Sequence, residues 1–178
     1  MSAESSAQFQ AISEIRFRIL EEAQRRPDLA LAMHEAGQAF VYEFNDIRVK
    51  RCQLAGEPID GTTELLHQSP VTKYSLWPHI VSIMAGAAAR HSLDERGAMT
   101  SATADMHRVA ECVEMVGINQ QQVEELIVEA AKAASTIIMK NFVAVMKIAD
   151  VLERKRRIEG DEIRQILREQ NGNFFQTL

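Results

Sequence analysis

The residues with the clearest chemical potential are His34 and Glu35, which stand together in the stretch MHEAGQAF over residues 33–40. In the zinc-protease signature H-E-x-x-H, two histidines one helical turn apart bind the metal, and the glutamate acts as general base on the metal-bound water. Here Gln38 takes the place of the second histidine. Because positions i and i+4 share a helix face, residues 34 and 38 can still converge on one metal ion while Glu35 flanks it.

On its own, this pair of residues is weak evidence for a site, because a helical histidine beside a solvated glutamate is common. The oxygen of a glutamine amide is also a hard donor that suits calcium better than zinc. Even changes around metal ligands typically lower the affinity by about 10–100-fold, so the loss of one of three ligands should cost more. The motif therefore predicts a zinc site that is weak or empty.

The elements that must position these residues are mostly helices. Hydrophobic periodicity and capping signals predict helices at 7–25, 27–45, 74–93, 104–117, 120–140, 142–157 and 157–170, a strand at 47–54, a loop or irregular hairpin at 55–72, and a loop at 93–103. The segments 120–140 and 142–157 are either two helices or one long helix broken near Asn141. The predicted class is mainly α with a small β element. We expect an amphipathic helix at 1–26, one domain at 27–170 and a loose tail at 171–178.

Composition and charge exclude several classes of function. The net charge of -5 argues against nucleic acid bound by bulk electrostatics. The two cysteines, Cys52 and Cys112, form no CxxC pair and are expected to be reduced thiols. The N-terminal residues do not resemble a signal peptide, the apolar stretches are too short for a membrane span, and no phosphate-binding loop motif occurs. We expect a soluble, cytoplasmic protein without a nucleotide site in this chain.

Several motifs in order give the chain a likeness to a known family from residue 32 to about residue 167. The matching segments are HEAGQA at 34–39 (HEAGHA in the family), the strand DIRVKRCQL at 46–54, the small-residue helix MAGAAARHSL at 84–93, TADMHRVA at 103–110, and ADVLERKRRIEGDEIRQIL at 149–167. The chain therefore resembles the C-terminal peptidase domain of FtsH-type AAA+ zinc metalloproteases. The expected fold is an FtsH-type peptidase-like helical domain.

The resemblance implies roles for three residues. His34 and Asp105 would be zinc ligands and Glu35 the general base, with Gln38 in the position of the missing ligand. The histidines at positions 79, 91 and 107 and the thiol of Cys112 are not spaced to replace it. Zinc is the cofactor that the resemblance implies, and Gln38 makes weak or absent binding the expectation.

The likeness leaves three functions open. The first is a metallopeptidase whose proteolysis, a hydrolase activity, is weakened or lost. The second is a non-catalytic pseudoenzyme that binds a peptide or an unfolded polypeptide, or regulates a ring-forming ATPase. The third is a plain helical interaction domain. A large distance between the side chains of His34 and Asp105 would favour it. The family joins its peptidase to a membrane anchor and an unfoldase, so cleavage of folded substrates would need a separate AAA+ ATPase. We expect the N-terminal helix either to pack on the domain or to form a self-association surface for a homo-oligomer.

Overall fold

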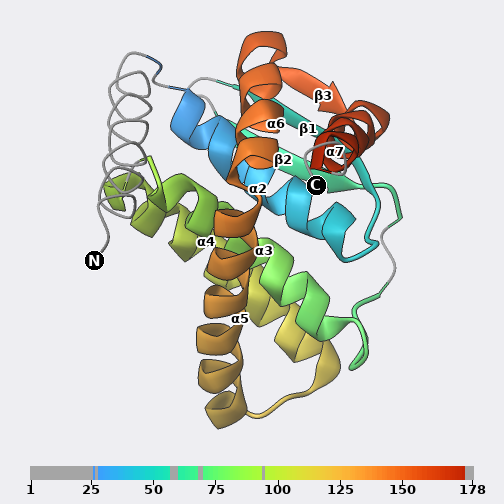
Figure 1. The fold of residues 1–178 in the computed structure, drawn as a ribbon. Coiled ribbons are helices and arrows are strands. Elements are labelled where there is room, and N and C mark those ends of the chain that lie inside the picture. Colours follow the sequence, from blue (N-terminus) through green and yellow to red (C-terminus); the bar gives the residue numbers. More distant parts are fainter. Residues whose placement is uncertain (1–25, 27, 57–59, 68–69, 94, 175–178) are drawn as a thin grey trace, which may run out of the picture.

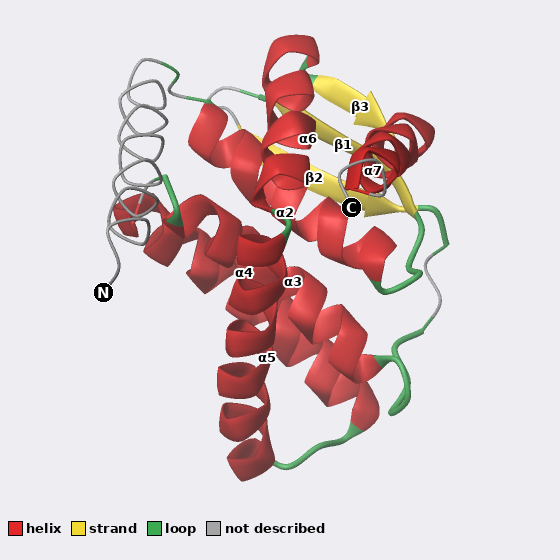
Figure 2. Ribbon diagram, viewed as in Figure 1, coloured by secondary structure: helices red, strands yellow, loops and turns green. Residues whose placement is uncertain are grey.

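The structure, a computed structural model, describes residues 26, 28–56, 60–67, 70–93 and 95–174. The helix predicted at 1–26 lies almost wholly outside these residues, as do residues 175–178 of the predicted tail. The described elements are α2 (Leu29–Phe44), β1 (Val49–Ala55), β2 (Asp60–Leu65), α3 (Leu76–His91), α4 (Glu95–Val116), α5 (Gln120–Lys140), α6 (Phe142–Lys155), β3 (Arg157–Glu159) and α7 (Gly160–Phe174). Helices dominate and the strands form one small sheet (Figure 2), which confirms the predicted class.

The sheet is antiparallel, with the strand order β2-β1-β3. β1 is the strand predicted at 47–54, and β2 lies within the segment predicted as a loop or irregular hairpin. β3 corrects the helix predicted from residue 157. Arg156 ends α6 in the left-handed conformation at φ 63°, and Ile158 then pairs with Cys52 of β1 and is buried. A long-range pairing of three residues leaves no periodic signal in the sequence.

α4 corrects a second prediction. The segment 93–103 was expected to be a loop because it contains Gly97, whereas α4 begins at Glu95 and runs through that glycine. A glycine inside a helix costs about 1 kcal/mol relative to alanine. The segment also contains the strong helix formers Ala98, Met99 and Ala102.

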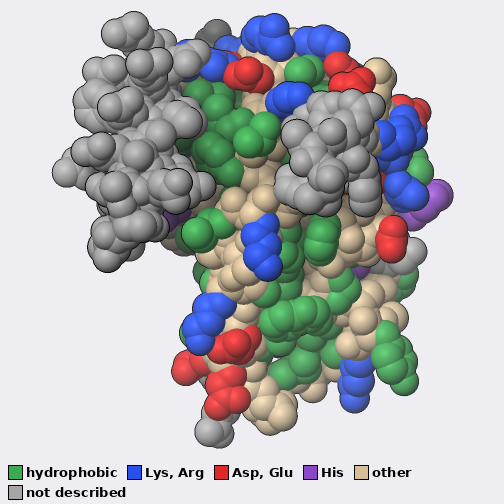
Figure 3. All heavy atoms as spheres, in the orientation of Figure 1, with side chains coloured by type: hydrophobic (Ala, Val, Ile, Leu, Met, Phe, Trp, Pro, Cys, Tyr) green, Lys and Arg blue, Asp and Glu red, His purple; other side chains and the backbone are tan. Residues whose placement is uncertain are grey.

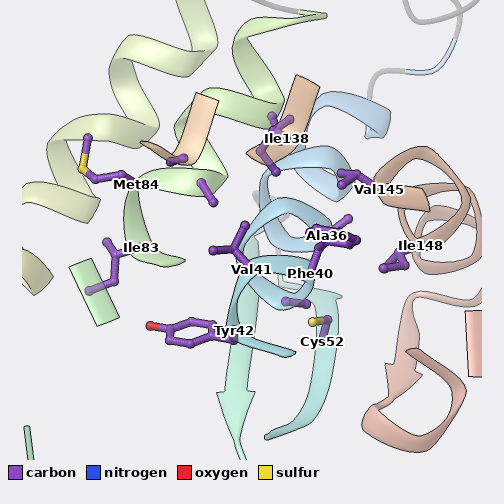
Figure 4. Packing of buried hydrophobic residues seen from close by; sticks show 14 of the residues in the cluster. Ala36, Phe40, Val41, Tyr42, Cys52, Ile83, Met84, Ile138, Val145 and Ile148 are labelled. Carbon is purple, nitrogen blue, oxygen red and sulfur yellow. The ribbon is translucent and has the colours of Figure 1, made fainter. Parts of the chain in front are cut away.

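α2 is the central element of the fold. It lies between the α3, α4 and α5 helices on one side and the sheet, α6 and α7 on the other (Figure 1), and nearly all of its residues are buried. Such a helix is apolar on most of its surface rather than along one stripe. Figure 4 shows Phe40, Val41 and Tyr42 of α2 among side chains from α3, α5 and α6.

Small residues let α2 and α3 approach closely. A Cβ atom on Gly37 would lie 2.6 Å from the backbone oxygen of Ala85 and from the Cβ of Ala89. The small residues of the segment 84–93 thus lie where α3 meets α2. None of the helices within the described residues has the length and apolarity that crossing a membrane requires.

Candidate functional site

The predicted site residues converge where α2 meets α4. His34, Glu35 and Gln38 are buried on α2, and Asp105 is buried on α4. The distance from His34 Nε2 to Asp105 Oδ2 is 3.6 Å, although the two residues are 71 positions apart in the sequence. A large separation of these two side chains would have favoured a plain helical interaction domain, and the structure does not show one.

The amide of Gln38 fills the point where these side chains meet. Its nitrogen, Nε2, is 2.9 Å from Asp105 Oδ1, 3.1 Å from His34 Nε2 and 3.3 Å from the backbone oxygen of Ile83. Its oxygen, Oε1, accepts a hydrogen bond of 2.9 Å from Arg108 Nη1. Gln38 itself is completely buried, so water does not compete for these groups.

The neighbours of Gln38 fix the orientation of its amide. Arg108 can only donate hydrogen bonds, so it must face the amide oxygen, and the carboxylate of Asp105 must face the amide nitrogen. Turning the amide over would place oxygen against carboxylate and N–H against guanidinium. A Gln38 N–H that points to His34 Nε2 requires that ring nitrogen as its acceptor.

These side chains do not fit a zinc ion as they stand. The group facing His34 and Asp105 is an amide N–H, a donor without a lone pair for a metal, and the amide oxygen is turned to Arg108. Among the described residues, no cluster of three or more histidine, cysteine, aspartate or glutamate side chains is placed to hold a metal ion. The roles of His34, Gln38 and Asp105 as metal ligands stay predictions.

α3 closes the site from the side opposite the sheet. A Cβ on Gly86 would lie 2.6 Å from His34 Cε1 and Nε2 and 2.9 Å from Gln38 Cγ. Any larger residue at position 86 would therefore push into the ring of His34. Two buried polar atoms of the site, His34 Nδ1 and Asp105 Oδ2, have no hydrogen-bond partner within the described residues.

The side chain of Glu35 points to the sheet, away from Gln38 and Asp105. Thr63 Oγ1 of β2 donates a hydrogen bond of 2.7 Å to Glu35 Oε2, and a Cβ on Gly61 would lie 2.6 Å from Glu35 Cγ and Oε1. Burial raises the pKa of the Glu35 carboxyl above its usual value. Glu35 is thus a buried carboxyl directly under β2, with its proton held to higher pH than in an ordinary glutamate.

The other candidate ligands lie elsewhere. His79 is held by the backbone oxygen of Ser75 at 2.9 Å, His107 and His91 are exposed, and Cys112 is a buried free thiol. The sequence reasoning missed Arg108, Thr63, Gly61 and Gly86. Only Arg108 carried a signal, because it follows Asp105 by three positions and so shares its helix face.

A second feature is an apolar hollow of about 380 Å³ between α2, α7 and the junction of α5 with α6. Figure 3 shows hydrophobic side chains along the middle of this face, and Phe44, Met139 and Val143 are exposed there. The one buried carboxylate of the hollow, Glu43, accepts hydrogen bonds from Val49 N and Arg164. Its contacts hold β1 and α7 to α2, which is a structural role.

Comparison with models of protein families and with curated proteins finds no match to this chain. The likeness to FtsH-type peptidase domains therefore remains a prediction that depends on the sequence motifs alone.

Proposed function

We propose that this chain is a pseudopeptidase, a domain of the FtsH peptidase type that binds an extended polypeptide without cutting it. The observation that carries the proposal is the position of the Gln38 amide. Its nitrogen donates to Asp105 Oδ1 at 2.9 Å and lies 3.1 Å from His34 Nε2, so it occupies the point where a metal would meet these two side chains. Glu35 then has no metal-bound water from which to remove a proton.

The proposed binding surface is the outer edge of β2. The Leu54 N–H donates a hydrogen bond of 2.8 Å to the backbone oxygen of Arg156, the residue before β3, so the backbone groups of Leu54 face β3. Backbone direction alternates along a strand, so Gln53 faces β2 and its partner Thr62 faces β1. Gly61 and Thr63 then turn their backbone groups to the outer edge, where the described residues provide no further strand.

An edge strand with free backbone groups can pair with an extended peptide, which supplies affinity through main-chain hydrogen bonds. The Gly61 N–H already bonds to the carboxylate of Asp60 at 2.8 Å, so the principal free donor is the Thr63 N–H. The side chains of the same two residues face Glu35 on α2. A peptide on this edge would thus lie beside the residue that acts as base in an active peptidase.

The test uses fluorescein-labelled casein as an unfolded polypeptide. We expect its fluorescence anisotropy to rise on titration with the protein, and mass spectrometry to find no cleavage products after incubation with zinc. Amide hydrogen exchange locates the surface, because bound casein should slow exchange at Thr63 and leave Thr62, which already faces β1, unchanged. Cleavage that disappears in Glu35→Gln would refute the pseudopeptidase. Absence of binding, or binding without slower exchange at Thr63, would refute the proposed surface.

A further inference from the structure

The charge balance of the site points to Arg108. Asp105 is 2% exposed, and a buried carboxylate is costly unless a positive group or several hydrogen bonds compensate it. In a metal site the cation supplies that compensation. Among the residues that the structure describes, two basic side chains come within 4 Å of the carboxylate: His34 at 3.6 Å and Arg108 at 3.9 Å. Of the two, Arg108 also donates a hydrogen bond of 2.9 Å to the Gln38 amide oxygen, and its guanidinium carries a permanent positive charge.

Gln38 connects this charge to the carboxylate. Arg108 donates to the amide oxygen at 2.9 Å, and the amide nitrogen donates to Asp105 at 2.9 Å. Two charge-assisted hydrogen bonds thus run in series through one buried amide, and each polarises the next. The side chain of Arg108 is 41% exposed, so its guanidinium reaches both the site and solvent.

We propose that Gln38 and Arg108 together replace a metal ion, and that Arg108 is the residue that keeps metal out. The amide fills the space between His34 and Asp105, and the guanidinium supplies the positive charge. To admit a cation, Gln38 would have to turn its oxygen inward, lose the bond from Arg108 and point its N–H groups at the guanidinium. A divalent ion would also be repelled by the guanidinium, because like charges at close range disfavour each other.

This inference rests on the proposed function because both take the site to be non-catalytic. Its own subject is the exclusion of metal, which is independent of polypeptide binding. The two can fail separately. Binding and cleavage of casein test the function, whereas zinc affinity of protein stripped of metal tests the inference. The readouts are isothermal titration calorimetry with zinc alone and the zinc-induced change in melting temperature.

The variants are Gln38→His, Arg108→Met and the double variant, with Arg154→Met, at an exposed position of α6, as the matched control. Gln38→His restores the set of three protein ligands that zinc sites use. Methionine keeps most of the length of the Arg108 side chain and removes its charge. We expect no zinc binding by the unchanged protein at micromolar zinc. We also expect the double variant to bind at least about tenfold more tightly than Gln38→His alone, the scale of changes around metal ligands.

Adding His34→Ala to the double variant should abolish binding. Equal zinc affinity of Gln38→His and the double variant would overturn the role of Arg108, and stoichiometric zinc in the unchanged protein would overturn metal exclusion. If the double variant fails to fold, the single variant Arg108→Met tests whether Arg108 excludes zinc. Its zinc affinity should exceed that of the unchanged protein and of Arg154→Met, and equal affinities would again refute the inference.

Discussion

Replacing Gln38 with methionine measures what the buried amide contributes to stability. Methionine has a similar length and volume, so the substitution opens little cavity and mainly removes hydrogen bonds. The contacts that disappear join Gln38 to the carboxyl group of Asp105, the guanidinium of Arg108 and the ring of His34. Because Gln38 is fully buried, water cannot take its place on Asp105.

The size of the effect follows from the exposure of each partner. A hydrogen bond to a charged group contributes about 1.5–3 kcal/mol, and a buried partner left unsatisfied bears the full cost. Asp105 has a side chain that is 3% exposed and bears that cost, whereas Arg108 is 41% exposed and water compensates much of its loss. We therefore expect Gln38→Met to lower the free energy of unfolding by about 2–4 kcal/mol, or the melting temperature by roughly 5–15 °C.

Urea unfolding followed by circular dichroism, in the presence of EDTA, gives the free energy of unfolding. The matched control is Gln165→Met, because the amide of Gln165 makes an exposed hydrogen bond to Glu169 at 3.0 Å. Its loss should change stability by less than about 0.5 kcal/mol. If Gln38→Met proves as stable as the control variant, the amide does not hold the site together, and the account of Gln38 as a substitute for a metal fails.

Two further substitutions test the surroundings of the site. Burial raises the pKa of Glu35 above 4.5, so the folded protein holds that proton more tightly than the unfolded chain does. Its contribution to stability therefore falls as the pH rises from about 4.5 through the raised pKa, and Glu35→Gln should flatten that part of the stability profile in urea unfolding at a series of pH values. Gly37→Ala should cost about 1–3 kcal/mol in calorimetric unfolding, because its Cβ would meet Ala85 O and Ala89 Cβ at 2.6 Å, and an unchanged melting temperature would mean that α2 and α3 can separate freely.

The local patterns predicted the helix that carries the site and the strand beside it. The periodicity of 27–45 matches α2, and the alternation in 47–54 matches β1. The family resemblance alone paired Asp105 with His34, and in the structure His34 Nε2 and Asp105 Oδ2 lie 3.6 Å apart, while their roles as metal ligands stay predictions. These features depend on neighbours in the sequence or on motifs that can be read letter by letter.

The remaining features depend on residues far apart in the sequence. β3 forms only because three residues pair with β1, and Glu35 faces Thr63 because the sheet lies on that side of α2. The direction of the Gln38 amide is decided by Arg108, seventy positions later. No pattern within a single helix contains that information, which is why the sequence predicted a weakened metal site and not an amide that occupies it.

The central position of α2 has a consequence for how the site can move. Segments with few buried contacts open locally at little cost in free energy, whereas core helices open only when the whole molecule unfolds. α2 packs against α3, α6 and the sheet and has almost no exposed residue. The free energy needed to release its residues from their neighbours therefore approaches the free energy of global unfolding. Displacement of α2 is therefore a costly way to regulate this site, whereas the side chain of Arg108 is 41% exposed and the strand β2 is only partly buried.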